Sequence, residues 1–133
     1  MNITLEQAEA VIAEAKKKAV EINTKMNIAV VDSGSNLVAF IHMDGGWIGS
    51  VDISMKKAKT AAWFQMDTKE LSPLVQPGQP LFNIEQSNGG LITFPGGVIL
   101  KNKGNEIIGA IGVSGSSVDD DHAVAEAGAS AIK

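Results

Sequence analysis

The sequence has no cysteine, no tyrosine and only two histidines among its 133 residues. Without cysteine, the chain cannot form a disulfide framework, a thiolate metal site, a cysteine nucleophile or a covalent haem attachment of the C-x-x-C-H type. The two histidines, His42 and His122, lie far apart in the chain, so it has no closely spaced histidine pair of the kind that binds zinc. The candidate metal ligands are therefore His42, His122 or an oxygen ligand.

The sequence also lacks a long apolar run, a basic leader and an excess of positive charge. Its longest clean apolar run, Leu37–Ile41, is far shorter than the roughly 20 residues that a membrane-spanning helix needs. No secretory signal is visible at the amino terminus, so we expect a cytoplasmic protein. The net charge of −4 argues against nucleic acid, because phosphate neutralisation supplies most of that affinity. We expect neither nucleic acid nor a membrane as a partner.

Glycine, by contrast, is abundant, with 14 residues that cluster at the ends of β-rich runs. Gly109, Gly112 and Gly115 recur at every third position, a spacing that matches neither the dinucleotide fingerprint nor the phosphate-binding loop. For Gly109 and Gly112 we expect that a helix or a neighbouring subunit packs closely against a strand, where a side chain would not fit. Room for a ligand is the alternative.

The helices follow from apolar periodicity and capping residues, within a single domain over residues 1–133. Apolar residues at alternating spacings of three and four predict a helix over residues 4–22, with Thr4 and Gln7 as a capping box. A second helix is predicted to begin at Ser50 or Asp52 and to end near residue 65. A closing helix is predicted over residues 119–132, with three aspartates at its positive end.

Five β-rich runs predict an antiparallel sheet. The element order is α-β-β-α-(α)-β-β-β-α, in which the bracketed helix is a short turn that Asp67 or Thr68 caps, followed by a proline-rich loop over residues 72–80. We therefore expect an α+β fold with a five-stranded antiparallel sheet flanked by helices. Because the first two runs are apolar on both faces, helices or a second subunit must cover both sides, which predicts a homodimer or larger homo-oligomer. The five runs span residues 28–32, 36–42, 91–94, 98–101 and 106–114.

Two side chains are candidates for chemistry. Lys57 shares a helical stripe with Thr60 and Phe64, and its amine could bind a carboxylate or form a Schiff base if it were desolvated. The favoured interpretation of Lys57 is nevertheless an ordinary solvated lysine. His42 is the second candidate, because it lies where a strand ends at a glycine pair. A metal site formed by His42, His122 and aspartates would require the fold to bring them together; otherwise His122 is an ordinary residue at a helix start.

Several motifs resemble, in order and spacing, those of a known family. They are Val30–Gly34, Met43–Gly45, Lys57–Ala61, Pro95–Gly97 and Ile108–Gly115. They cover essentially the whole chain and resemble the GlcG/HbpS-like haem-binding family, which includes the carboxy-terminal domain of PduO-type proteins. The resemblance implies an antiparallel five-stranded sheet, oligomeric assembly, and haem or a related tetrapyrrole as the ligand of some members. It also implies an association with glycolate, propanediol or glycerol utilisation.

The resemblance also outlines a ligand pocket. The positions that match family motifs, or lie beside them, are His42, Asp44, Gly45, Lys57, Thr60, Phe64, Pro95, Gly96, Gly97, Ser114 and Gly115. Many members have arginine where this chain has His42. An arginine would bind a carboxylate through two parallel hydrogen bonds, whereas a histidine could ligate iron instead.

Three functions are consistent with these observations. The leading hypothesis is a small oligomeric protein that binds haem, a related tetrapyrrole or a small carboxylate. The first alternative is an enzyme that acts on hydroxy-acid or aldehyde substrates, with Lys57 or His42 as the base. The second alternative is a structural accessory subunit, whose glycine-rich strand serves only for packing between subunits.

Overall fold

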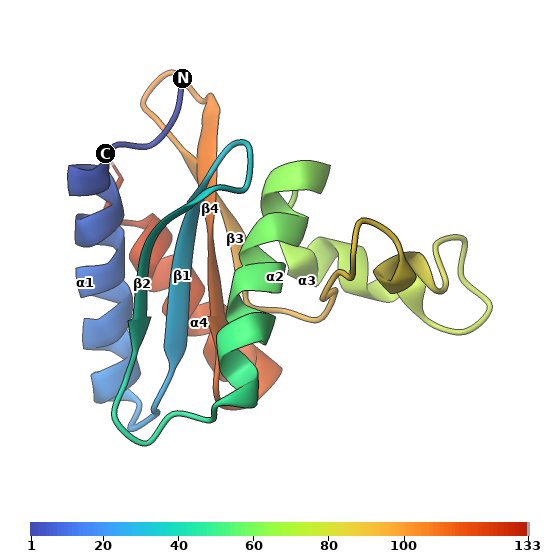
Figure 1. Cartoon of the computed structure of the whole chain (residues 1–133), viewed down its shortest axis with the longest axis horizontal. Coiled ribbons are helices and arrows are strands. Elements are labelled where there is room, and N and C mark those ends of the chain that lie inside the picture. The colour runs from blue at the N-terminus through green and yellow to red at the C-terminus, as the bar shows by residue number, and fades with distance from the viewer. Residues whose placement is uncertain (133) are drawn as a thin grey trace.

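A four-stranded antiparallel sheet forms the centre of the fold, with helices on both faces (Figure 1). The structure is a computed structural model that describes residues 1–132. The strands lie in the order β2-β1-β4-β3. The helices and strands are α1 (Leu5–Glu21), β1 (Asn27–Asp32), β2 (Leu37–His42), α2 (Gly49–Phe64), α3 (Thr68–Leu71), β3 (Gly97–Lys101), β4 (Ile107–Ser114) and α4 (Val118–Ala129).

The two outer helices begin as the sequence predicts. The Thr4 side chain accepts a hydrogen bond from the Gln7 backbone N–H, and the Gln7 side chain accepts one from the Thr4 backbone, which confirms the capping box of α1. Ser117 caps α4, because its side chain accepts a hydrogen bond from the backbone N–H of Asp120. The predicted caps of α2 are wrong, because Ser50 and Asp52 both lie inside a helix that begins at Gly49.

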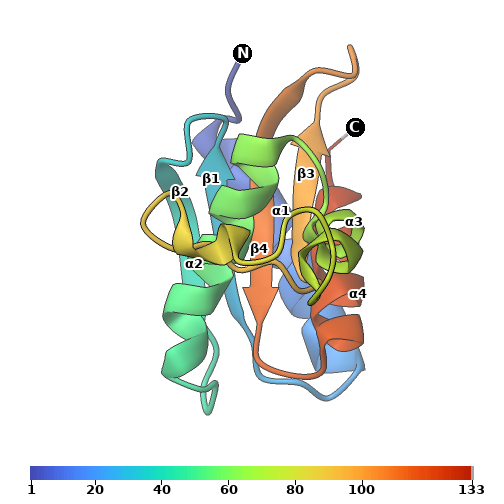
Figure 2. The same ribbon diagram turned by 90° about the vertical axis from the view of Figure 1, so that its right-hand side faces the viewer.

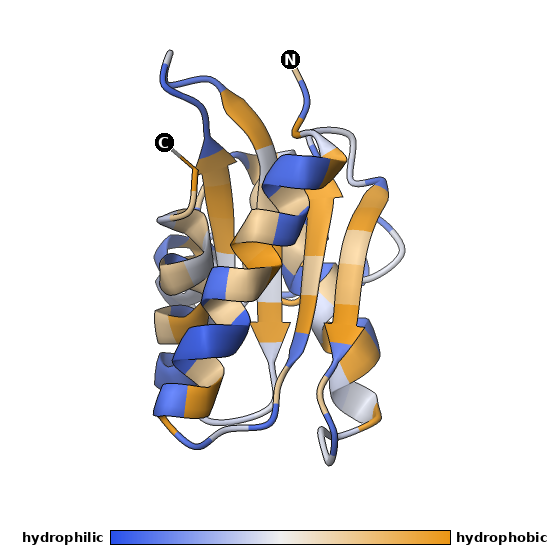
Figure 3. Ribbon diagram, turned by 90° about the vertical axis from the view of Figure 1, so that its left-hand side faces the viewer, coloured by the Kyte–Doolittle hydropathy of each residue, from blue (hydrophilic) through white to orange (hydrophobic). Residues whose placement is uncertain are grey.

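Helices cover both faces of the sheet, as the apolar pattern of the strands requires. Helices α1 and α4 lie on one face and α2 on the other (Figure 2; Figure 3). The core beneath α1 and α4 is large and contains Val11, Ile28 and Ile111, among others. The core beneath α2 is small and consists mainly of alanines on α2, together with Val31 and Ala110. The sheet therefore needs no second subunit to bury most of its two faces.

The glycines of β4 explain why the core beneath α2 is small. A Cβ atom on Gly112 would overlap the Ser54 carbonyl oxygen of α2 and lie 2.6 Å from the Ala58 backbone nitrogen. A Cβ atom on Gly109 would overlap the carbonyl oxygen of Val31 in the neighbouring strand. The prediction of close packing against a helix is thus confirmed for Gly112. The partner is α2 of the same chain rather than a second subunit.

The predicted fifth strand does not form, so the sheet has four strands instead of five. Residues 91–94 run alongside α2 without joining a ladder. The backbone N–H of Leu91 donates to the Glu85 carbonyl at 2.9 Å, and that of Ile92 donates to the Thr60 hydroxyl at 3.3 Å. These partners are a carbonyl of the 3₁₀ turn Ile84–Gln86 and a side chain of α2. The two N–H groups therefore find their hydrogen bonds outside the sheet.

The proline-rich segment projects from the body of the molecule between α3 and residue 90 (Figure 1). It contains two short 3₁₀ turns, Ser72–Val75 and Ile84–Gln86, so the prediction of a loop without regular structure over residues 72–80 is only partly correct. No helix in residues 1–132 is long and apolar enough to cross a membrane.

Candidate functional site

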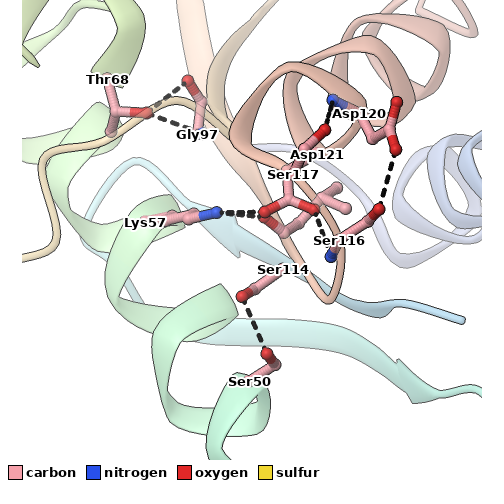
Figure 4. Close-up of polar contacts among 10 residues, drawn as sticks. Ser50, Lys57, Thr68, Gly97, Ser114, Ser116, Ser117, Asp120 and Asp121 are labelled. Carbon is pink, nitrogen blue, oxygen red and sulfur yellow. Dashed lines mark hydrogen bonds and ion pairs between the residues drawn. The ribbon is translucent and has the colours of Figure 1, made fainter. Parts of the chain in front are cut away.

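Lys57 is buried without any exposed surface, which overturns the prediction of a solvated lysine. Its Nζ donates to the Val113 carbonyl oxygen at 2.8 Å and to Asp121 Oδ2 at 2.8 Å (Figure 4). Its amine also lies 4.9 Å from the centre of the Phe94 ring, within the range of a cation–π interaction. The lysine of α2 thereby connects β4, α4 and the segment that precedes β3.

Burial dominates the electrostatics of this ion pair. Desolvation lowers the pKa of Lys57, and the attraction of Asp121 only partly opposes this. Desolvation likewise raises the pKa of Asp121, against the attraction of Lys57 and the hydrogen bond that its Oδ1 accepts from the Ser116 N–H at 3.0 Å. Each charge is therefore costly to bury and depends on the other for its ionised form.

The turn at Pro95–Gly97 closes over Lys57. Gly96 has a φ of +132°, and a Cβ atom there would lie 2.6 Å from Lys57 Nζ and 2.5 Å from the Val113 carbonyl oxygen. Gly97 donates its backbone N–H to the Thr68 hydroxyl at 2.9 Å. The glycines of this turn make room for the lysine. The predicted pocket around Lys57 is thus a packed interior in this conformation, and a substrate cannot reach the amine.

Other predicted pocket residues are also committed to internal contacts. Ser114 Oγ donates to Ser50 Oγ at 3.0 Å, in a buried pair between β4 and α2 (Figure 4). Thr60 is buried, and its hydroxyl donates to the Lys56 carbonyl at 2.7 Å while accepting from Ile92. Phe64, at the end of α2, is half-buried.

His42 differs from all of these, because it is exposed at the end of β2. Its Nδ1 lies 2.5 Å from Oδ1 of Asn27, the residue opposite it on β1. Asn27 has no exposed surface, and its Nδ2 donates to the backbone carbonyl of Trp47 at 2.9 Å. Asn27 is not among the site residues that the sequence predicts. The sequence feature that could have identified it is an amide residue at the start of an otherwise apolar strand. In the hairpin, this residue pairs with the histidine of the second strand.

A shallow hollow beside His42 continues along α1. It has a volume of about 360 Å³ and is lined by Lys16, Ile41, His42, Met43 and Asp44. A more apolar hollow of about 340 Å³ shares Lys16 and Ile41 with it and is also lined by Glu9, Ile12, Ala13, Ala39 and Phe40. The two hollows together form a groove between α1 and the edge strand β2.

Gly45 and Gly115, two further predicted positions, meet in a separate hollow. Its volume is about 460 Å³, and its lining includes Lys25, Trp47 and Ser116. The eleven predicted positions therefore do not form one pocket. They divide into the interior around Lys57, the surface around His42 and Asp44, and this hollow.

The structure does not assemble a metal site from the two histidines. Within residues 1–132, no group of three or more His, Asp or Glu side chains could hold a metal ion. His122 belongs to α4 and is 8% exposed, with its Nε2 3.4 Å from Glu126 Oε1 and no hydrogen-bond partner for its Nδ1. His122 thus lies near the start of α4, as predicted, and is largely buried.

None of the six aromatic side chains belongs to the buried core. Phe40 and Phe64 are half-buried. The other four are substantially exposed: Trp47 at 66%, Trp63 at 44%, Phe82 at 51% and Phe94 at 39%. Exposed aromatic side chains are typical of surfaces that bind a flat ligand or another protein.

Comparisons with known proteins match the whole domain. The family model described as haem degrading protein HbpS-like matches residues 3–130. The chain is 39% identical over 128 residues to an uncharacterised 15.0 kDa protein in the dhaT-dhaS intergenic region of Citrobacter freundii, covering 94% of this chain and 88% of the relative.

Two further matches concern PduO. The chain is 31% identical to the corrinoid adenosyltransferase PduO of Citrobacter freundii over 99% of its own length, but it spans only 39% of that protein. The crystal structure of a PduOC:haem complex superposes with a TM-score of 0.93 at 28% identity, covering 100% of this chain and 96% of the other.

Proposed function

Because the chain belongs to the HbpS-like family, we propose that it binds haem, with His42 as the residue that would hold the iron. The observation that carries the proposal is the exposed His42 ring, which is anchored through Nδ1 to the buried Asn27. The solved PduOC:haem complex, which shares the fold over the whole chain, supports haem as the ligand.

The residues around His42 fit a porphyrin better than a bare metal ion. A porphyrin supplies four nitrogen ligands itself, so one imidazole from the protein is sufficient to hold the iron. A bare zinc ion would need three or four protein ligands, and the described part of the chain offers no such cluster. Bound haem would supply a redox-active iron at this surface.

The groove beside His42 also suits the periphery of the ligand. Ile41 and Met43 line the hollow that adjoins His42. The half-buried Phe40, two residues before His42, lies on the same face of β2 as the histidine. Lys16 lines both halves of the groove and offers a positive charge to a propionate. Apolar walls with one or two placed charges are typical of cofactor sites.

Titration of the apoprotein with haemin tests the proposal. We expect a shifted and saturable Soret band for the wild type, and its loss or strong weakening for His42→Ala because the imidazole that would hold the iron is gone. Imidazole added to His42→Gly should restore the wild-type Soret position. His122→Ala, whose ring is largely buried, should keep the band. An unchanged Soret spectrum in His42→Ala would contradict the role of His42, and no saturable band at all would contradict haem binding.

We also propose that the protein associates with itself. The supporting observations are the four exposed aromatic side chains and the large apolar side chains Ile48 and Leu37, which are 84% and 52% exposed. The edge strand β2 carries no charged residue, whereas natural proteins commonly use charge to protect an open edge. An assembly would cover these groups.

A role in the metabolism of glycolate, diols or glycerol is the accompanying proposal. Its support is the relative in the dhaT-dhaS intergenic region, together with the similarity to PduO. Deletion of the gene should slow growth of the host on glycerol or propanediol but not on glucose. Equal growth on all of these carbon sources would contradict this role.

A further inference from the structure

The orientation of the Asn27 side chain is fixed by the group that it faces on one side. Its Nδ2 lies 2.9 Å from the backbone carbonyl oxygen of Trp47. A carbonyl oxygen can only accept a hydrogen bond, so the amide nitrogen must point toward it. The reverse orientation would place two oxygens against each other in a position where Asn27 has no contact with water.

This orientation determines which nitrogen of His42 carries the proton. With its nitrogen turned to Trp47, Asn27 presents Oδ1 to His42 Nδ1 at 2.5 Å. An amide oxygen has no hydrogen to donate, so the bond forms only if Nδ1 is the donor. In a neutral imidazole the other nitrogen, Nε2, then holds a free electron pair.

We infer that Asn27 is a positioning residue that keeps His42 in the Nδ1–H tautomer, with the Nε2 electron pair directed away from Asn27 and available to a metal. The ligand part of this inference rests on the proposed haem function. The tautomer itself is a property of the protein without ligand. Histidines that ligate metals commonly donate their second N–H to a carbonyl or carboxylate, which fixes the ring and the tautomer.

The surroundings make Asn27 rigid. It is paired with His42 on β2 and with Ser114 on β4, so a strand lies on each side of it. The group that His42 Nδ1 faces is therefore held in place by the sheet on both sides. The sheet thus holds the acceptor of His42 Nδ1 in one orientation.

Nuclear magnetic resonance of the apoprotein tests the tautomer directly. Long-range ¹⁵N–¹H spectra at a pH at which both histidines are neutral should show a protonated Nδ1 and an unprotonated Nε2 for His42. His42→Ala assigns the signals by their loss, and His122 serves as an internal reference. A protonated Nε2 on His42 would overturn the inference, whether or not the protein binds haem.

Asn27→Leu removes the amide at nearly constant volume. We expect the His42 tautomer preference to be lost and the haemin Kd to rise by roughly 10- to 100-fold, the usual effect of losing such an outer partner. Asn36→Leu, at the other, exposed end of the hairpin, should leave both the His42 tautomer and the haemin Kd unchanged. Circular dichroism confirms that each variant is folded. A folded Asn27→Leu protein that keeps the wild-type tautomer would overturn the role of Asn27, while absence of haemin binding by the wild type would count only against the proposed function.

Discussion

At the scale of single residues, the buried pair of Lys57 and Asp121 connects α2 to α4, two elements whose paired residues lie 64 positions apart. One lysine amine binds an acid on α4 and a carbonyl on β4. The family motif that contains Lys57 predicts that this lysine lines a pocket. In the tertiary structure, Lys57 instead forms an internal ion pair. Such pairs contribute little net stability over apolar packing, yet removing one partner is strongly destabilising because the other charge stays buried.

Lys57→Met should therefore lower the free energy of unfolding by about 3 to 5 kcal/mol at neutral pH. Lys56→Met is the matched control, because Lys56 forms only a surface pair with Asp52 at 3.0 Å. Denaturant unfolding followed by circular dichroism measures both variants. A loss in Lys57→Met no larger than in Lys56→Met would contradict the structural role of the buried pair.

The stability deficit of Lys57→Met should shrink as the pH falls. Burial raises the pKa of Asp121, and Lys57 opposes that rise, so removing Lys57 lets the pKa rise further. The native variant then binds a proton more tightly than its unfolded chain, and its stability increases as the pH falls through the raised pKa toward the ordinary value of 3.8. A deficit that stays constant between pH 8 and pH 5 would contradict this explanation.

At the scale of elements, the contact between α2 and β4 depends on the absence of a side chain at Gly112. Gly112→Ala would place a Cβ against the backbone of α2, which can yield only if the whole helix shifts. We expect a loss of about 1 to 3 kcal/mol or more. A Cβ on Gly49 meets nothing within 4 Å, so Gly49→Ala should leave stability equal or slightly higher. Thermal melting compares the two; equal melting temperatures would show that the helix does not pack as described.

The edge of β3 is protected by the side chains at the start of α3. The Asp67 carboxylate accepts the backbone N–H of Ile99 at 3.0 Å, and the Thr68 hydroxyl accepts that of Gly97 at 2.9 Å. The short helix predicted at Asp67 or Thr68 thus does more than connect elements. It occupies an edge that could otherwise pair with another chain.

Thr68→Val should weaken the edge of β3, because valine keeps the shape of the buried side chain but removes the hydroxyl that accepts the Gly97 N–H. An unpaired buried N–H costs about 1 to 3 kcal/mol, and the Gly97 amide should exchange its hydrogen faster. Native-state hydrogen exchange measures this, with the Ile99 amide, which Asp67 still holds, as the internal reference. Equal acceleration at both amides would indicate a general loss of structure instead.

At the scale of the whole molecule, the aromatic side chains lie outside the core. A small alanine-rich core beneath α2 and a larger aliphatic core beneath α1 and α4 hold the fold together without any ring. Four of the six aromatic side chains are exposed at the surface, where they support the proposal of self-association.

Ile48→Lys should shift the protein toward a smaller species if this surface is an interface. Ile48 is 84% exposed in the single chain, so the change removes no buried contact from the monomer. Val20→Lys, at 62% exposure on α1, is the matched control and should leave the mass unchanged. Sedimentation velocity measures the mass. A monomeric wild type, or an Ile48→Lys variant of unchanged mass, would count against self-association through this residue.

The sequence by itself determined the helices, both hairpins, the α+β class and the family. These features depend on local periodicity, capping and turn residues, which act over a few positions of the chain. The tertiary structure alone decided how many strands pair and where each polar group lies. Residues 91–94 have the composition of a strand, but the N–H groups of Leu91 and Ile92 bind Glu85 and Thr60 instead of a neighbouring strand. The burial of Lys57 and the anchoring of His42 by Asn27 depend on residues far away in the sequence, which only folding brings within hydrogen-bond distance.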